Sequence, residues 1–337
     1  MNDDIKILAL ETSCDETAAA VSKNGLNILS SVVASQVDWH KKYGGVVPEI
    51  ASRKHMEFIN PVVEEALKKA DLTLENIDAI AATYGPGLVG SLLVGLSYAK
   101  ALAFALNKPF IGVNHIAGHI YANFISKKDI KTPVICLTVS GGHTDLLYFE
   151  KYGDYEILGR TKDDAAGEAF DKIARYLGLG YPGGPIIEKK AKKGREDAVN
   201  FPRPFLDKDN YDFSFSGLKT AVINYIHNQK QKGNELDAED IAASFQRAVI
   251  DILTAKTVKA ALHKNVNSVI LSGGVAANKR FREVLRDRLK QEEVPLYYPD
   301  LKLCTDNAAM ISTVAYYQYK KREFAELDLN ADPNLQL

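Results

Sequence analysis

The stretch Ile5-Lys-Ile-Leu-Ala-Leu-Glu-Thr-Ser-Cys-Asp-Glu-Thr-Ala-Ala-Ala-Val-Ser22 decides the fold. Its two apolar runs and the polar turn at 11–16 predict a pair of buried strands, and residues 28–35 predict a third strand after them. The same pattern returns in Val134-Ile-Cys-Leu-Thr-Val-Ser-Gly-Gly-His-Thr-Asp-Leu-Leu-Tyr-Phe149, followed by a third strand at 155–160. A repeat of roughly 130 residues is too long for a solenoid and predicts two similar domains.

Helical periodicity alternates with further predicted strands in both halves. Helices are expected at 48–70, 88–106, 238–264 and 275–289, and strands at 77–84, 110–113 and 268–271. This alternation predicts an α/β fold. The two domains are expected at 1–133 and 134–305, and the second is expected to carry a mostly helical insertion at about 183–234. A final helix at 306–325 is expected to close a cleft between the domains, and a frayed tail is expected at 326–337. The cleft is the expected ligand site.

Composition narrows the class of protein. The chain has 337 residues with 42 basic and 43 acidic side chains, so no overall field attracts nucleic acid or acidic membranes. Cys14, Cys136 and Cys304 form no CxxC motif, which argues against disulfides and a thiolate zinc site. The acidic start, Met1-Asn-Asp-Asp4, is unlike a signal peptide. We expect a cytoplasmic protein.

Residues 88–106 are apolar enough to be considered as a membrane span, but Lys100 interrupts them. We expect a buried helix here. The small residues Gly87, Ser91 and Gly95 are four positions apart, which lets another backbone approach the helix closely.

His115 and His119 are spaced i and i+4, so both imidazoles can reach one metal ion from the same face of a helix. Two surface or capping histidines are the alternative. The pair differs from a metallopeptidase HExxH motif because Ile116 stands in place of the glutamate base. Asp306 is the best distant candidate for a third ligand, and its alternative role is the N-cap of the final helix.

Glycine-rich turns follow predicted strands at Ser140-Gly-Gly142, Ser272-Gly-Gly274 and Gly85-Pro-Gly87. Such turns let backbone N–H groups approach a phosphate, and they occupy equivalent places in the two halves. A nucleotide ligand is the favoured interpretation. The first turn, Glu11 to Thr17, is rich in carboxylates and hydroxyls and can position a proton acceptor; a solvated hairpin is the alternative.

The combined motifs resemble those of the TsaD family, the tRNA N6-adenosine threonylcarbamoyltransferases. They cover residues 5 to about 320: Glu11-Thr-Ser-Cys-Asp-Glu-Thr17, Gly44-Gly-Val-Val-Pro-Glu49, Gly85-Pro-Gly-Leu88, Asn114 to His119, Val139-Ser-Gly-Gly-His-Thr144, Tyr181-Pro-Gly-Gly-Pro185, Phe215-Ser-Gly-Leu-Lys-Thr220, Ser272-Gly-Gly-Val-Ala-Ala-Asn278 and Thr305-Asp-Asn307.

The resemblance implies duplicated ribonuclease-H-like domains of the actin/Hsp70/sugar-kinase type around a nucleotide cleft. It implies transfer of a threonylcarbamoyl group from threonylcarbamoyl-AMP to N6 of the adenosine on the 3′ side of the anticodon, in tRNAs reading codons that begin with A, with release of AMP. It also implies two protein partners, a paralogous TsaB-like subunit and a small TsaE-like ATPase.

The resemblance further assigns residues. The implied ligands of one Fe²⁺, or of Zn²⁺ in preparations, are His115, His119 and Asp306. The implied substrate contacts are Thr138, Val139, Ser140, Gly141 and Gly142 for the phosphate and acyl portion, Asp171, Gly184 and Glu188 for the ribose, and Asn278 for the adenine. Asp15 or Glu16 is the candidate proton acceptor.

Two other functions stay open at this point. One is a metallopeptidase acting on glycoproteins, which lacks its expected base here, and the other is a non-catalytic nucleotide-binding subunit of the same fold. Two basic stretches, Lys189 to Arg195 and the four arginines between Arg280 and Arg288, are candidate tRNA contacts, although such runs are usually solvated.

Overall fold

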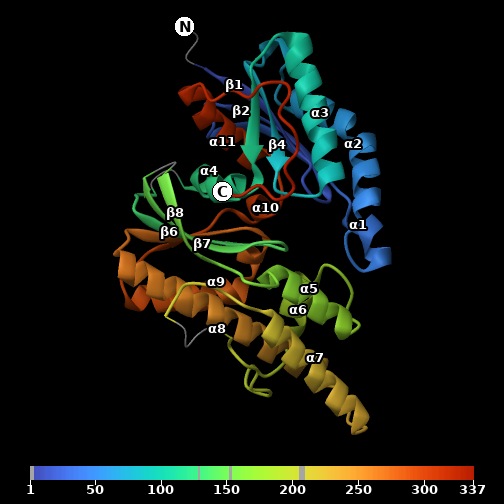
Figure 1. Cartoon of the computed structure of the whole chain (residues 1–337), viewed down its shortest axis with the longest axis vertical. Coiled ribbons are helices and arrows are strands. Elements are labelled where there is room, and N and C mark those ends of the chain that lie inside the picture. The colour runs from blue at the N-terminus through green and yellow to red at the C-terminus, as the bar shows by residue number, and fades with distance from the viewer. Residues whose placement is uncertain (1–3, 128–129, 152–153, 205–208) are drawn as a thin grey trace. The chain divides into compact units, whose positions relative to one another are not determined.

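The structure is a computed structural model and describes residues 4–127, 130–151, 154–204 and 209–337 (Figure 1). The first three residues of the acidic start lie outside this range. The chain forms two compact units: Met1–Lys128 with Pro299–Leu337, and Asp129–Tyr298. Residues 299–305 were expected in the second domain, but they belong to the first unit. Leu303 packs against a core cluster of the first unit, and the neighbouring Cys304 is buried.

The first unit is built on a five-stranded sheet in the order β3-β2-β1-β4-β5. Its strands are β1 (Lys6–Glu11), β2 (Glu16–Lys23), β3 (Asn27–Ser35), β4 (Ala79–Gly85) and β5 (Phe110–Asn114). The first three are antiparallel, whereas β1, β4 and β5 are parallel.

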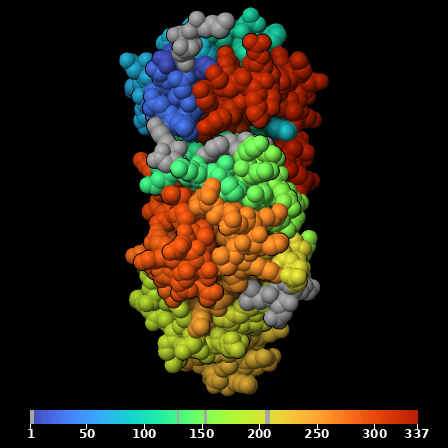
Figure 2. Space-filling view, turned by 90° about the vertical axis from the view of Figure 1, so that its left-hand side faces the viewer, coloured from blue at the N-terminus to red at the C-terminus, as the bar shows by residue number. Residues whose placement is uncertain are grey.

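Helices cover both faces of this sheet. Leu8 and Leu10 face α2 (Pro48–Lys69) and α3 (Val89–Leu106), while Ile7 and Ala9 face α4 (His115–Ser126) and α11 (Ala308–Lys321). The strand period of two therefore places alternate β1 residues in two separate cores. Thr313 Oγ1 on α11 donates to the Gly25 carbonyl between β2 and β3. Figure 2 shows the red C-terminal part of the chain beside the blue N-terminal part. A short α1 (Val37–His40), η1 (Lys41–Tyr43), η2 (Leu74–Asn76) and α10 (Leu301–Cys304) complete the unit.

The second unit repeats this topology with the sheet order β10-β9-β6-β7-β8. Its strands are β6 (Val134–Val139), β7 (Thr144–Lys151), β8 (Asp154–Arg160), β9 (Ser268–Ser272) and β10 (Leu296–Tyr297). Again three strands are antiparallel and β6, β9 and β10 are parallel. The duplication predicted from the sequence is confirmed.

The helices of the second unit are α5 (Ala166–Tyr176), α6 (Gly183–Ala191), α7 (Ser216–Gln231), α8 (Ala238–Lys264) and α9 (Lys279–Gln291), with η3 at Gly274–Ala277. The insertion expected to be mostly helical has α6 and α7 near its ends, and the residues described between them, 192–204 and 209–215, have little regular structure. The helix expected from residue 275 begins at Lys279, because η3 occupies the preceding turn.

Small residues on α3 allow the β1–β2 turn to approach the helix, as predicted. A Cβ on Gly95 would lie 2.3 Å from Thr12 Oγ1, and this hydroxyl donates to the Ser91 carbonyl. By length and composition α3 is a candidate membrane span. Only one of its faces is buried, and Val89, Leu93 and Phe104 are exposed, so the expectation of a buried helix holds for one face.

The segment 325–336 follows α11 and is packed, so the expectation of a frayed tail was wrong. Leu329 and Ala331 join the core between the sheet and α3, next to Gly112, which lacks a side chain. Backbone bonds tie the segment to the sheet edge: Ala325 N to Phe110 O, Asp332 N to Tyr84 O and Gly87 N to Pro333 O.

Candidate metal centre

The carboxyl ends of β1, β4 and β5 meet at one edge of the first sheet, and this edge carries the site. Glu11 ends β1 and is fully buried. Its Oε2 accepts a hydrogen bond from Thr83 Oγ1 on β4 at 2.6 Å, and its Oε1 accepts one from the Ser13 amide at 2.6 Å. A buried carboxylate requires such partners because desolvation would otherwise favour its neutral form.

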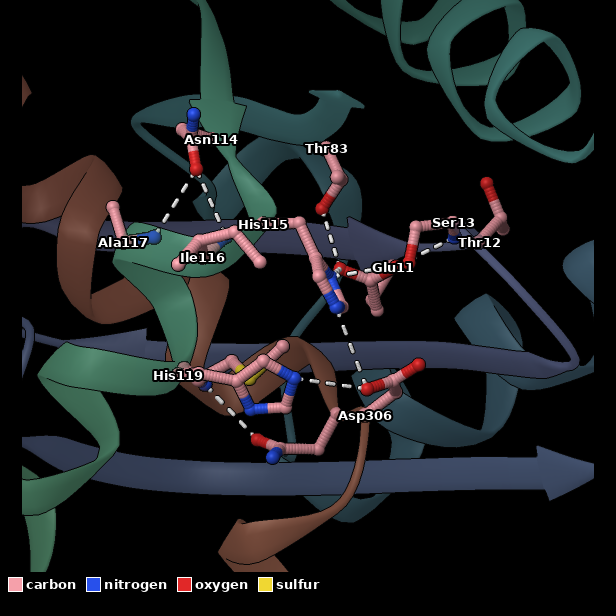
Figure 3. Close-up of polar contacts among 12 residues, drawn as sticks. Glu11, Thr12, Ser13, Thr83, Asn114, His115, Ile116, Ala117, His119 and Asp306 are labelled. Atoms are coloured by element: carbon pink, nitrogen blue, oxygen red, sulfur yellow. Dashed lines mark hydrogen bonds and ion pairs between the residues drawn. The ribbon is translucent and has the colours of Figure 1, made fainter. Parts of the chain in front are cut away.

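The two histidines follow β5 on the first turns of α4. Asn114 caps the helix, since its Oδ1 accepts from the amides of Ile116 and Ala117 at 2.8 and 3.2 Å. His115 and His119 then lie one turn apart with ring centroids separated by 4.6 Å (Figure 3). Both side chains are buried. The predicted placement on one helix face is confirmed.

Asp306 completes the cluster from the loop before α11. Its Oδ1 lies 3.0 Å from His119 Nε2 and 3.5 Å from His115 Nε2 (Figure 3). One ligand atom from each of the three residues lies within 4.8 Å of the others. The alternative role for Asp306 was wrong, because Asn307 caps α11 by accepting from the Met310 amide at 3.0 Å.

The donor set fits a metal ion. Glu11 Oε2 lies 2.9 Å from His115 Nδ1, so the carboxylate accepts the Nδ1–H bond, and Nε2, which lies 3.5 Å from Asp306 Oδ1, is the nitrogen left to bind a metal ion. Two imidazoles and one carboxylate that converge in this way match divalent transition metals. Glu11 is placed where an outer carboxylate would orient a metal-binding histidine.

The charges of the cluster are strongly coupled. Burial alone would lower the pKa of His115, but the carboxylates of Glu11 and Asp306 raise this pKa to about 9. Burial opposes ionisation of Glu11, yet the charge of His115 and its hydrogen bond lower the Glu11 pKa. In the metal-free cluster His115 is therefore protonated at neutral pH, and a bound ion would take the place of that proton.

The β1–β2 turn that bears Asp15 and Glu16 is folded against the unit rather than solvated. Asp15 is 9% exposed, and Thr12, Ser13 and Thr17 are 1% exposed, so the alternative of a solvated hairpin was wrong. Burial and the nearby charge of Asp306 raise the pKa of Asp15. Burial also raises the pKa of Glu16 to about 7, despite a hydrogen bond from Ser35 Oγ at 2.8 Å.

In the second unit, the residues predicted for the phosphate portion lie at the end of β6. Thr138 and Val139 are buried, and the Thr138 hydroxyl is 2.8 Å from Ser272 Oγ. Gly141 and Gly142 are exposed, with no atom within 4 Å of where a Cβ would stand. The accessible part of this turn is therefore the glycine pair.

The remaining predicted substrate contacts are connected by hydrogen bonds within the second unit. Asp171 Oδ1 accepts from the Gly183 amide at 2.7 Å, beside Gly184 at the start of α6. Glu188 accepts from the Lys279 amide at 3.2 Å, next to Asn278. The Asn278 side chain caps α9 and donates to Gln246 Oε1 at 2.8 Å. The structure thus brings α5, α6 and the start of α9 together, and the ligand roles of these residues stay predictions.

The sequence analysis did not identify Glu11 as the partner of His115. The sequence gives one signal: a carboxylate directly ends an apolar strand that is otherwise buried. Its partner is 104 positions away, and no spacing rule connects them.

Comparison with known proteins places the chain in a family. A family model described as "TsaD: tRNA N6-adenosine threonylcarbamoyltransferase" matches residues 27–313. A protein of that name from Clostridium botulinum (strain Kyoto / Type A2) is 57% identical over 337 residues, covering 100% of this chain and 99% of the relative. One from Clostridium kluyveri (strain NBRC 12016) is 56% identical over 338 residues, with the same coverage.

Solved structures of lower identity share the fold. HypF from T. kodakarensis has a TM-score of 0.66 at 17% identity, covering 95% of this chain and 49% of HypF. Component A of the Acidaminococcus fermentans (R)-2-hydroxyglutaryl-CoA dehydratase has a TM-score of 0.56 at 16% identity, covering 95% and 99%. With the repeated sheets, these likenesses confirm the duplicated ribonuclease-H-like fold. The chain belongs to the TsaD family, the tRNA N6-adenosine threonylcarbamoyltransferases.

Proposed function

We propose that the chain transfers the threonylcarbamoyl group of threonylcarbamoyl-AMP to N6 of the adenosine 3′-adjacent to the anticodon, in tRNAs reading codons that begin with A. The observation that carries this proposal is identity of 57% over the whole chain with relatives named for tRNA N6-adenosine threonylcarbamoyl transfer. The buried His–His–Asp cluster agrees with it, since such a cluster gives the protein a metal-binding centre.

The reaction needs a proton acceptor as well as a positioned acyl group. The N6 amine attacks the carbamoyl carbon, the bond from that carbon to the phosphate oxygen breaks, and AMP leaves with the electron pair. N6 forms one new bond and must lose one proton. Glu16, with its pKa of about 7, is suited to accept that proton near neutral pH, and Asp15 is the neighbouring candidate.

We assign His115, His119 and Asp306 as the ligands of one Fe²⁺ ion. Two histidines and one carboxylate that leave open positions are a typical ligand set of non-haem Fe²⁺, although Zn²⁺ fits the same donors. When bound, the metal supplies a Lewis acid that can polarise or orient the carbamate. Glu11 holds the His115 ring in the ligating tautomer.

The second unit is assigned to the adenylate. Gly141 and Gly142 offer backbone N–H groups to the phosphate next to Ser140, whose own N–H donates to the His143 carbonyl at 2.9 Å. Asp171, Gly184, Glu188 and Asn278 are assigned to the nucleoside. The assignment is supported by the open space above the glycine pair and above Gly184.

Two partners and a location complete the proposal. A TsaB-like paralogous subunit and a TsaE-like ATPase assist the enzyme, and the protein acts in the cytoplasm. Support comes from the family and from cysteines that form no CxxC motif.

The test is reconstitution. Purified protein, a threonylcarbamoyl-AMP-forming enzyme and the two partners are incubated with tRNA, threonine, bicarbonate and ATP, and nucleosides are analysed by mass spectrometry. We expect threonylcarbamoyladenosine with the wild type and a large loss with His115→Ala. No product from either protein, or cleavage of a glycoprotein that His115→Ala abolishes, would contradict the transferase assignment.

The metal assignment has its own measurement. Metal content is determined by mass spectrometry after dialysis against a weak chelator. His119→Ala is expected to lose the ion, and Glu11→Gln to bind it about 10- to 100-fold more weakly because an orienting partner is weakened. His263→Ala, which alters an exposed hydrogen bond to Tyr211 in the second unit, is the control and should retain wild-type content.

A further inference from the structure

A buried chain of polar side chains in the first unit is used by none of the functions assigned so far. Gln36, His40 and His55 are each 0% exposed, and they connect the loop before α2 to the β1–β2 turn. Burying three polar side chains is costly unless every group is satisfied. Such a network is therefore expected where the position of a backbone segment matters.

The hydrogen bonds of His55 define its tautomer. His55 Nε2 lies 3.0 Å from the Cys14 carbonyl, which can only accept, so Nε2 carries the proton. His55 Nδ1 then accepts from Thr17 Oγ1 at 2.8 Å. One neutral ring thus holds a carbonyl and a hydroxyl on the two sides of Asp15 and Glu16.

The side chains of His40 and Gln36 extend this network, and their hydrogen bonds are donated in a consistent direction along it. The Val47 amide donates to His40 Nδ1 at 3.3 Å, so His40 Nε2 donates to Gln36 Oε1 at 3.3 Å. Gln36 Nε2 donates to the Ala51 carbonyl at 3.3 Å and lies 3.4 Å from His55 Nδ1.

The backbone of Gln36 reaches the same turn. Its amide donates to the Asp15 carbonyl at 3.0 Å. The carbonyls of Cys14 and Asp15 are therefore both held from the α1–α2 side of the unit. A further bond on this side, from Ser35 Oγ, reaches the Glu16 carboxylate.

We propose that His55 is a positioning residue: with Gln36 and His40 it fixes the backbone at Cys14 and Asp15, and thereby the direction of the Asp15 and Glu16 carboxylates. This role rests on the proposed function, in which one of these carboxylates takes the proton from N6. Displacement of a reacting group by about 1 Å can cost two orders of magnitude in rate.

The central variant is His55→Leu, which keeps an apolar volume but removes both hydrogen bonds. We expect kcat to fall about 10- to 100-fold, with KM for tRNA and the metal content unchanged. His55→Gln can still donate to the Cys14 carbonyl and should recover most of the rate. Thr17→Val is nearly isosteric, loses only one bond and should show an intermediate loss.

The matched control is Val63→Ala, which removes buried volume from the same helix α2 without touching the network. It should lower Tm to a similar extent as His55→Leu but leave kcat near that of the wild type when assayed below Tm. An equal loss of kcat in Val63→Ala would show that the effect is general destabilisation, and would overturn the proposal.

A readout independent of activity separates this inference from the function on which it rests. Hydrogen exchange of the Gln36 amide, which donates to the Asp15 carbonyl, should accelerate in His55→Leu and in Thr17→Val but not in Val63→Ala. Unchanged exchange, or wild-type kcat in His55→Leu, overturns the positioning role. Accelerated exchange in a protein whose wild type forms no threonylcarbamoyladenosine would overturn the proposed function instead.

Discussion

At the scale of single residues, the environment of each carboxylate decides its role. Glu11 is buried but bonded to a hydroxyl, an amide and an imidazole, so it stays ionised and orients His115. Glu16 is less enclosed by donors, and burial raises its pKa to about 7. Two glutamates five positions apart in one turn therefore differ in charge near neutral pH.

Glu16 makes the activity and the stability respond to pH in opposite directions. As pH rises through about 7, Glu16 ionises, so kcat is expected to rise if it accepts the N6 proton. Because its pKa is higher in the folded state than the ordinary value of 4.5, the folded state binds the proton more tightly. The free energy of unfolding therefore falls as pH rises from about 4.5 to about 7.

Glu16→Gln tests both statements. We expect kcat to fall about 100-fold or more, the rise of kcat near pH 7 to disappear, and Tm to become less dependent on pH between 5 and 7 (about the window given by the two pKa values). The measurements are pH profiles of kcat and of Tm. If the profile of the variant keeps the same inflection, another group is the proton acceptor.

The sequence predicted those residues of the site that local spacing connects. His115 and His119 are one helical turn apart, so their spacing predicted that both side chains share one helix face and can reach one metal ion, with two surface or capping histidines as the alternative. Asp306 could be proposed only as a ligand or a cap, because spacing does not show that Asn307 takes the cap. The His55–Cys14 contact joins positions 41 apart, and local periodicity has no information on such contacts.

At the scale of elements, segment 325–336 closes the edge of the first sheet at the Gly85-Pro-Gly87 turn. A Cβ on Gly85 would lie 2.0 Å from the Asp332 carbonyl and 2.8 Å from Leu335 Cβ. Gly85 is therefore required by the packing of this segment, whereas the sequence had indicated a phosphate-binding turn.

Gly85→Ala should displace the segment. We expect a loss of about 1–3 kcal/mol in the free energy of unfolding, as for other overpacked sites, and faster proteolysis after residue 325. Gly217→Ala is the control, because its Cβ would lie 3.4 Å from the nearest atom, Pro204 Cγ. Equal stability of both variants would contradict this packing.

Sequence periodicity predicted the long helices correctly. It did not predict segments whose structure depends on tertiary contacts. Helix α8 was predicted at its observed bounds, and the structure adds Asp237 as its N-cap. The segment 325–336 has no periodicity, and its order comes from backbone bonds to strands more than two hundred positions earlier. Composition rich in Asp, Asn and Leu gave no sign of this.

At the scale of the whole molecule, the two units differ in chain continuity. The second is one stretch, Asp129–Tyr298, whereas the first needs Pro299–Leu337 to cover one face of its sheet. We expect the fragment 129–298 to unfold cooperatively and the fragment 1–128 to lack a cooperative transition, because Ile7 and Ala9 lose their cover from α11. Thermal unfolding followed by circular dichroism measures this. A cooperative transition in fragment 1–128 would contradict it.

The duplication was visible in the sequence because both halves begin with the same strand–turn–strand pattern. Chain position did not reveal that the last helix returns to the first unit. The apolar face of α11 fits either sheet by pattern alone, and only its contacts with β1 and the β2–β3 turn decide between them.

In the sequence, the whole second unit lies between the two histidines and Asp306, and His119 precedes Asp306 by 187 positions. Chains fold while they are synthesised from the N-terminus. A growing polypeptide therefore carries Glu11 and both imidazoles through the synthesis of the whole second unit before the third donor leaves the ribosome. Under the proposed metal assignment, the full ligand set can capture its ion only late in biosynthesis, and a truncated product that ends early carries an incomplete centre.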